Sequence, residues 1–305
     1  MKALSIRMTA LTALIAGLAW SSAAQAYWTL DTGTNTTVNA GTSVGDSGNA
    51  AYTVQMSGFY VGNALNGASK LSGNWTAGTM TDFSGGGIGM YTGTDASSPY
   101  HALDNNENTE GVLLSFSAST VLSSIGLGYT ATTAATPEYG CVSGGAVVGT
   151  TTGTCASGTK TTAPSVDVSI FRWTGGAAPT LAGTAAGTMG GWELVGNYGD
   201  FIQDTSNPYN TVNSAGKTSS WWLITAYNSG FTQSASTVNR GTLSNGDDFF
   251  KLYAAAGTKC TGTVDANGVC GGTTVRVPEP ASLALTSVAL LGMAGLRRRK
   301  AKAAA

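Results

Sequence analysis

Short runs of strand character, separated by segments rich in Gly, Asn, Ser and Thr, constrain the fold of this 305-residue chain more than any other feature. Apolar residues alternate at period two in several runs, as in Val166, Val168 and Ile170 against Asp167 and Ser169. No stretch shows a sustained helical period. The runs are residues 51–61, 112–118, 121–129, 165–173, 191–195, 219–227 and 248–254.

Short strands with Gly-rich turns and no intervening helices predict an all-β fold, either an antiparallel β-sandwich or a jelly roll. The composition agrees, because only 10% of residues are charged and 43 are Gly, which leaves few of the residues that helical surfaces use. In one run, Trp221 and Leu223 share one face, and Trp222 and Ile224 share the other. We therefore expect that strand to be covered on both sides, within one domain over residues 27–276.

The charges are distributed unevenly. Seven of the fifteen Lys and Arg residues lie in the terminal segments, so residues 27–276 hold eight basic and fifteen acidic residues, a net charge of −7. Binding to a phosphate backbone needs clustered Lys and Arg that replace counterions. Nucleic acid is therefore excluded as an expected partner.

Residues 1–26 have the three parts of a secretory signal peptide. Lys2 and Arg7 precede an apolar run over residues 8–20, and the segment ends in Ala24-Gln25-Ala26. A short apolar run with a small-x-small ending is typical of a cleaved signal. We expect export through the Sec translocon and cleavage by signal peptidase between Ala26 and Tyr27.

The other end, residues 277–305, also has three parts. Val277, Pro278, Glu279 and Pro280 precede an apolar segment over residues 281–296, and Arg297, Arg298, Arg299 and Lys300 follow. Sixteen residues form about 24 Å of helix, slightly less than the roughly 30 Å hydrocarbon layer. We expect a single hydrophobic helix that holds the exported body at the inner membrane, with the basic cluster as a cytoplasmic stop-transfer signal.

This end resembles the PEP-CTERM sorting signal. The resemblance implies recognition by an exosortase, a membrane enzyme of bacteria that have outer membranes and make exopolysaccharide. The body is similar in addition to exosortase-dependent surface proteins, a likeness that implies a cell-surface or extracellular location and no catalytic residues. The segments that carry this second likeness are residues 100–106, 111–116, 127–129, 167–171, 196–198, 220–228 and 247–252.

The four cysteines form two local pairs, Cys141 with Cys155 and Cys260 with Cys270, each in a loop rich in Gly and Thr. Four cysteines allow three connectivities. An exported chain meets an oxidising compartment, so we expect the two local disulfides. Metal binding is the weaker alternative, because the spacings are too long for Cys-x-x-Cys sites.

Few residues suit catalysis. His101 is the only histidine, and the segment Gly45-Asp46-Ser47-Gly48 is interpreted as a turn rather than as part of a serine-protease triad. Two carboxylate pairs, Glu107 with Glu110 and Asp247 with Asp248, could flank a glycosidic bond. Neighbouring strand residues point to opposite faces, so Asp247 and Asp248 converge only if a turn redirects them. We expect no catalytic residues, no cofactor and no enzyme activity, with a glycoside hydrolase as the last alternative.

Two binding hypotheses remain from the residue types. The oxygen-rich segment DNNENTE, residues 104–110, forms either a calcium site outside the EF-hand pattern or, as the default that we adopt with no metal ligand assigned, an Asx-rich turn. Exposed aromatic rings could stack on sugars, although Trp residues in such folds usually lie in the core. The candidate rings are Trp28, Trp75, Trp173, Trp192, Trp221, Trp222, Tyr100 and Tyr198.

These observations together predict an exported protein that an exosortase releases from the inner membrane to the cell surface or the extracellular matrix. A structural or adhesive role in a biofilm is the leading hypothesis. A module that binds the organism's own exopolysaccharide is the second.

Overall fold

The computed structural model describes residues 25–63, 71–92, 101–203, 209–232 and 241–272. These residues form antiparallel strands, so the predicted all-β antiparallel class is confirmed. Within these ranges no helix is long and apolar enough to cross a membrane. Residues 1–24, most of the predicted signal peptide, and residues 277–305, the predicted sorting signal, lie outside the described residues.

Sixteen strands are described. They are β1 (Ala26–Thr29), β2 (Thr36–Val38), β3 (Thr42–Asp46), β4 (Asn49–Asn63), β5 (Leu71–Phe83), β6 (Gly87–Tyr91), β7 (Leu103–Asp104), β8 (Asn108–Thr132), β9 (Tyr139–Ser143), β10 (Ala146–Thr151), β11 (Thr159–Pro164), β12 (Val166–Trp173), β13 (Trp192–Phe201), β14 (Tyr209–Thr211), β15 (Ser219–Ala226) and β16 (Asp248–Lys259).

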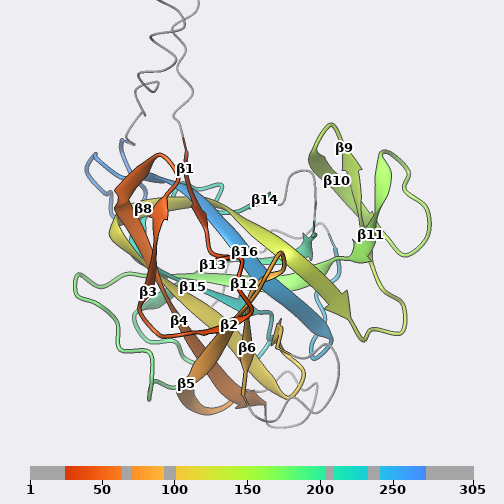
Figure 1. The fold of residues 1–305 in the computed structure, drawn as a ribbon, viewed down its shortest axis with the longest axis horizontal. Coiled ribbons are helices and arrows are strands. Elements are labelled where there is room, and N and C mark those ends of the chain that lie inside the picture. The colour runs from red at the N-terminus through yellow and green to blue at the C-terminus, as the bar shows by residue number, and fades with distance from the viewer. Residues whose placement is uncertain (1–24, 64–70, 93–100, 204–208, 233–240, 273–305) are drawn as a thin grey trace, which may run out of the picture. The chain divides into compact units, whose positions relative to one another are not determined.

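The 25-residue strand β8 organises the main sheet (Figure 1). Its first half pairs with β4 on one side and with β15 on the other, and its second half pairs with β16 and β14. From β4 the path runs through β5, β6 and β16 and returns to β8. Five strands therefore close into a barrel-like sheet, and β15, β12 and β13 extend the sheet beyond β8.

This closure differs from the expected arrangement. The sequence predicted two packed sheets of a sandwich or jelly roll, and the strand pairing does not confirm them. It also predicted two strands over residues 112–118 and 121–129, where the structure has the single strand β8. The polar step at Ser119 and Thr120 suggested a turn, but there the chain stays extended while its partner changes from β4 to β16.

The extended part of the sheet is covered on both faces, as predicted for β15. Trp222 and Ile224 belong to the main core, whereas Leu223 belongs to a second cluster on the opposite face. The segment between β12 and β13 covers that second face with Leu181 and Met189. It is joined to β5 by backbone hydrogen bonds between residues 75 and 183–184 of 2.8–2.9 Å.

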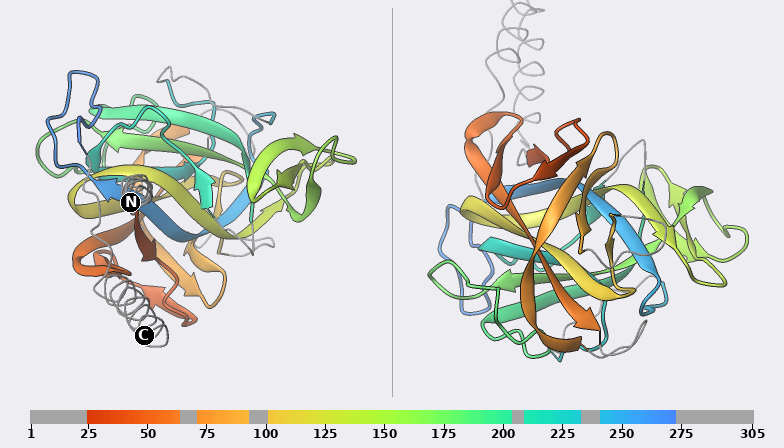
Figure 2. Two further views of the ribbon diagram at one scale, coloured as in Figure 1. Left: turned by 90° about the horizontal axis from the view of Figure 1, so that it is seen from above. Right: turned by 60° about the horizontal axis from the view of Figure 1, so that its bottom comes forward.

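A separate three-stranded sheet, β10-β9-β11, projects beside the main sheet (Figure 2). The disulfide Cys141–Cys155 joins β9 to the loop between β10 and β11, with Cα atoms 5.6 Å apart. Such a cross-link restricts the unfolded chain and stabilises a loop of this length by about 3 kcal/mol. This disulfide was predicted from the sequence and is confirmed.

We predict that Trp28→Ala lowers the free energy of unfolding by about 3–5 kcal/mol, the usual range for truncating a buried aromatic side chain. Trp28 is fully buried, packs edge-on against Tyr52 and Phe116, and donates its indole N–H to the Tyr52 carbonyl at 2.9 Å. Urea unfolding measures the loss. The matched control is Tyr91→Ala, which removes a ring that is 46% exposed and should change stability by less than about 0.5 kcal/mol.

Candidate functional site

Four carboxylates line one pocket of about 270 Å³. Asp167 lies near the start of β12, Asp248 is the first residue of β16, Asp247 precedes it, and Glu138 lies just before β9. Ser244 completes the polar wall. Among the described residues, this is where buried acidic groups meet a cavity.

A hydrogen-bond network fixes the innermost carboxylate. Asp248 Oδ1 accepts the backbone N–H of Asp167 at 2.9 Å, and Asn105 Nδ2 donates to Asp248 Oδ2 at 3.0 Å. Asn105 also accepts the backbone N–H of Asp248 at 3.0 Å and donates to the Tyr227 carbonyl at 2.8 Å. One amide side chain therefore ties the ends of β7, β15 and β16 together.

Ser244 connects the two outer aspartates. Its backbone N–H donates to Asp167 Oδ2, and its hydroxyl lies 3.3 Å from that oxygen and 2.8 Å from Asp247 Oδ1. These donors stabilise negative charge. They lower the pKa values of these two carboxyl groups, whereas burial raises them by more.

The pKa of Asp167 is raised from 3.8 to about 7, mainly by burial and in addition by the charges of Asp247 and Glu138, while the Ser244 hydrogen bonds act in the opposite direction. Burial, followed by the charges of Asp167 and Asp247, raises the pKa of Asp248 well above its ordinary value. Burial also raises the pKa of Asp247. Neighbouring buried carboxylates do not all ionise together near neutral pH, so the cluster keeps a proton that it could donate.

Asp247 and Asp248 line the same pocket, which the sequence allowed only if a turn redirects one of them. The rule of opposite faces holds within a strand, but Asp247 lies in the segment that leads into β16. Sequence reasoning missed Asp167 and Glu138 as members of the site. Asp167 stands opposite the apolar residues of an alternating strand, and that pattern is typical of a solvent-facing residue.

The other carboxylate pair is not part of this pocket. Glu110 is buried within β8 and pairs across strands with Tyr60 of β4, and Glu107 lies in the turn before β8. Neither residue lines the pocket. The structure therefore gives no geometry in which these two would face a common substrate there.

The segment 104–110 begins with an Asx turn, as expected. Asp104 Oδ1 accepts the backbone N–H of Asn106 at 3.0 Å, and β8 begins at Asn108 rather than at Val112. In the described part of the chain, no group of three or more His, Cys, Asp or Glu side chains is arranged to hold a metal ion.

Most of the aromatic candidates for sugar stacking are core residues. Trp28, Trp75, Trp192 and Trp222 are buried, and Trp173 and Trp221 pack against the second cluster. Tyr198 lies in β13, and its buried hydroxyl accepts the Asn213 N–H at 2.9 Å. Tyr100 lies outside the described residues.

The Ser47 segment is a turn between β3 and β4, as predicted. The backbone N–H of Ser47 donates to the Tyr27 carbonyl at 2.9 Å. His101 stacks instead on Phe83, with ring centroids 5.5 Å apart.

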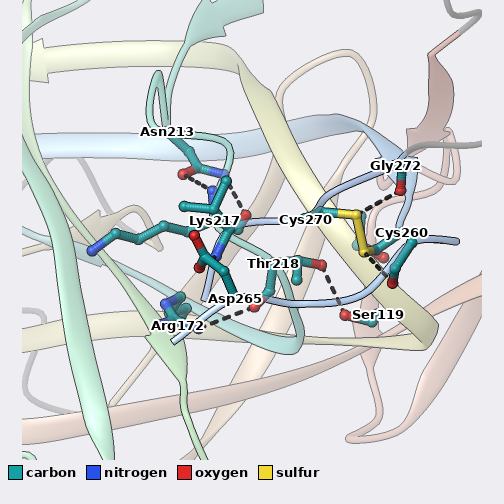
Figure 3. Close-up of a disulfide and its surroundings, with 12 residues drawn as sticks. Ser119, Arg172, Asn213, Lys217, Thr218, Cys260, Asp265, Cys270 and Gly272 are labelled. Carbon is teal, nitrogen blue, oxygen red and sulfur yellow. Dashed lines mark hydrogen bonds between the residues drawn. A yellow bond between two sulfur atoms is a disulfide. The ribbon is translucent and has the colours of Figure 1, made fainter. Parts of the chain in front are cut away.

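The second disulfide, Cys260–Cys270, was also predicted and is confirmed (Figure 3). Arg172 contacts the loop that this disulfide closes, because its guanidinium donates to the Asn267 carbonyl at 3.3 Å. It also donates to the Thr218 carbonyl, just before β15, at 3.2 Å. The same guanidinium pairs with Glu193, which also binds Lys217. This network fixes the last described turn of the chain onto β12 and β15.

Comparison with protein-family models, with curated proteins and with solved structures finds no match to this chain.

We predict that acid stabilises the cluster. Because the pKa of Asp167 is higher in the folded chain than the unfolded value of 3.8, its contribution is fully present below about pH 4 and is lost as the pH rises through about 7. A difference of about three pKa units sets a ceiling of about 4 kcal/mol. Urea unfolding at pH 4.5 and pH 8 measures the difference.

The matched variant is Asp167→Asn, which keeps an oxygen for the Ser244 N–H and removes the titration. The fall in stability between pH 4.5 and pH 8 should then be smaller than in the wild type. An unchanged fall would show that Asp167 does not carry the effect.

Proposed function

We propose that this chain is an exported protein that an exosortase releases from the inner membrane to the cell surface or extracellular matrix, where it has a structural or adhesive role. In this proposal the motif Val277-Pro278-Glu279-Pro280 is the recognition element. The apolar segment 281–296 is a membrane helix, and the cluster 297–300 is its cytoplasmic stop. The proposal includes that the body has a sandwich-like fold and is related to exosortase-dependent surface proteins.

One observation carries the proposal. The compact unit spans Gln25–Thr273 and contains two disulfides, and the predicted signals precede and follow it in the sequence. Disulfides persist in oxidising compartments outside the cytoplasm. The Pro residues at 278 and 280 favour an extended backbone, which is the form that a processing enzyme binds.

Binding of exopolysaccharide is the second candidate function. It is favoured by a row of aromatic rings that lies outside the core, formed by Phe83, Tyr91, His101 and Tyr129. A protein held in a polysaccharide matrix would use such a surface for retention.

We predict that replacing Pro278, Glu279 and Pro280 with Ala leaves the full-length precursor in the inner membrane, because the recognition element is removed while the apolar anchor stays. Fractionation and intact mass of the exported protein measure the result. The control replaces Thr273 and Thr274 with Ala, upstream of the motif, and should be released normally. Normal release of the triple variant would contradict the sorting assignment.

The amino end gives an independent prediction. The Tyr27 backbone N–H donates to Asp46 Oδ1 at 2.9 Å, and Asp46 is buried. Cleavage after Ala26 would turn this N–H into an α-ammonium beside a carboxylate. Hydrogen bonds to charged groups contribute about 1.5–3 kcal/mol, so Asp46→Asn should lower the free energy of unfolding of the mature chain by that amount.

Urea unfolding of chains that begin at Tyr27 measures the loss. The control carries the same substitution in a chain with Gln25 and Ala26 retained, where Tyr27 has an ordinary amide. Its loss should be smaller. Equal losses would mean that the terminal ammonium does not bind Asp46.

A further inference from the structure

Five side chains form a continuous surface on the outward side of the closed sheet, here named the Lys251 patch. Tyr91 and His101 have ring centroids 4.9 Å apart, and His101 and Phe83 are 5.5 Å apart. Lys251 Nζ lies 3.8 Å from the centroid of Phe83 and 4.9 Å from that of Tyr129. An ammonium thus stands between two rings at one end of an aromatic row.

Local structure fixes these positions. Lys251 of β16 and Tyr129 of β8 are direct cross-strand partners, so their side chains share a face. His101 has a φ of 62°, a left-handed conformation that is uncommon for a residue with a Cβ. Its carbonyl packs against Gly89 of β6 so closely that a Cβ there would not fit. The arrangement is built into the fold rather than left to side-chain rotation.

The positive charge of Lys251 in this patch is not neutralised. Arg172 and Lys217 pair with Glu193, and Lys160 donates to the Gly153 carbonyl at 3.1 Å. Within the described residues, Lys251 Nζ has contacts with aromatic rings and no hydrogen-bond acceptor or ion-pair partner. Burial lowers the pKa of Lys251 from its ordinary value, so an anion would find this ammonium already partly stripped of water.

The combination of groups specifies a class of ligand. Flat aromatic faces stack on the apolar faces of sugar rings, and a partly desolvated ammonium binds a carboxylate through charge-assisted hydrogen bonds. Tyr91, the far ring of the row, is 46% exposed and so accessible for stacking. The domain has a net charge of −7, so a polyanion would not be held by its overall charge and needs a local site.

We propose that the Lys251 patch binds uronic-acid residues of an acidic polysaccharide, with the sugar carboxylate on Lys251 and the sugar rings along Phe83, His101 and Tyr91. This inference rests on the proposed function, because an exported matrix protein meets such polymers. It adds to that function the residues that bind the polysaccharide and the acidic character of the polysaccharide.

The test is binding of the full-length chain in detergent to polygalacturonate oligomers, measured by calorimetry. Lys251→Met keeps the apolar stem and removes the charge, and should weaken binding about tenfold. Tyr91→Ala should weaken it several-fold. The matched control is Lys160→Met, which removes the other ammonium that lies over a ring, 4.0 Å from the centroid of Tyr139, and should leave binding unchanged.

Four outcomes would overturn the inference. Two concern the variants: wild-type affinity of Lys251→Met, or an equal loss in Lys160→Met. Two concern the ligands: polyphosphate binding as tight as polygalacturonate binding, which would show recognition of charge without a sugar, or stronger binding of neutral dextran than of polygalacturonate. Failure here is distinct from failure of the sorting proposal, because the binding assay does not depend on carboxyl-terminal processing.

Discussion

The continuous hydrogen-bond ladder along β8 is the constraint on which the rest of the structure depends. Its 25 residues pair with four other strands, two in each half. β4 pairs with the first half of β8, and β16 pairs with its second half. Since β5 and β6 connect β4 to β16 by further strand pairing, the sheet closes. Closure removes free edges in this part of the sheet, where unpaired backbone groups would invite association.

The same strand also separates two cores. In the first half of β8, Val112, Leu114 and Phe116 face the main core, and Leu113 faces the second cluster. The period of two in side-chain direction makes this division a direct consequence of an extended backbone. It explains why the central strands of this sheet carry apolar residues on both faces.

Two polar regions at opposite sides of β16 have contrasting electrostatics. At the start of the strand, Asp248 is buried among other carboxylates and is fixed by Asn105. Farther along, Lys251 faces outward between aromatic rings. The first region concentrates negative charge inside the fold and raises the pKa values of its groups, whereas the second presents positive charge on an otherwise acidic domain. These different environments are the physical basis of the pH-dependent stability predicted for the first region and of the binding proposed for the second.

The sequence by itself determined the all-β class, the positions of most long strands, the two disulfides and the Asx turn at Asp104. These features depend on local rules: side-chain alternation, turn residues, and loops short enough to bring their cysteines together. It missed β5, whose Gly, Thr and Ser residues show little alternation, and it split β8 at Ser119 and Thr120. Only the tertiary structure decided the closure of the sheet, the meeting of Asp167 with Asp247 and Asp248, and the row of rings around Lys251. In each case the partners are distant in sequence, and their contact follows from strand register, which one strand's pattern of residues does not contain.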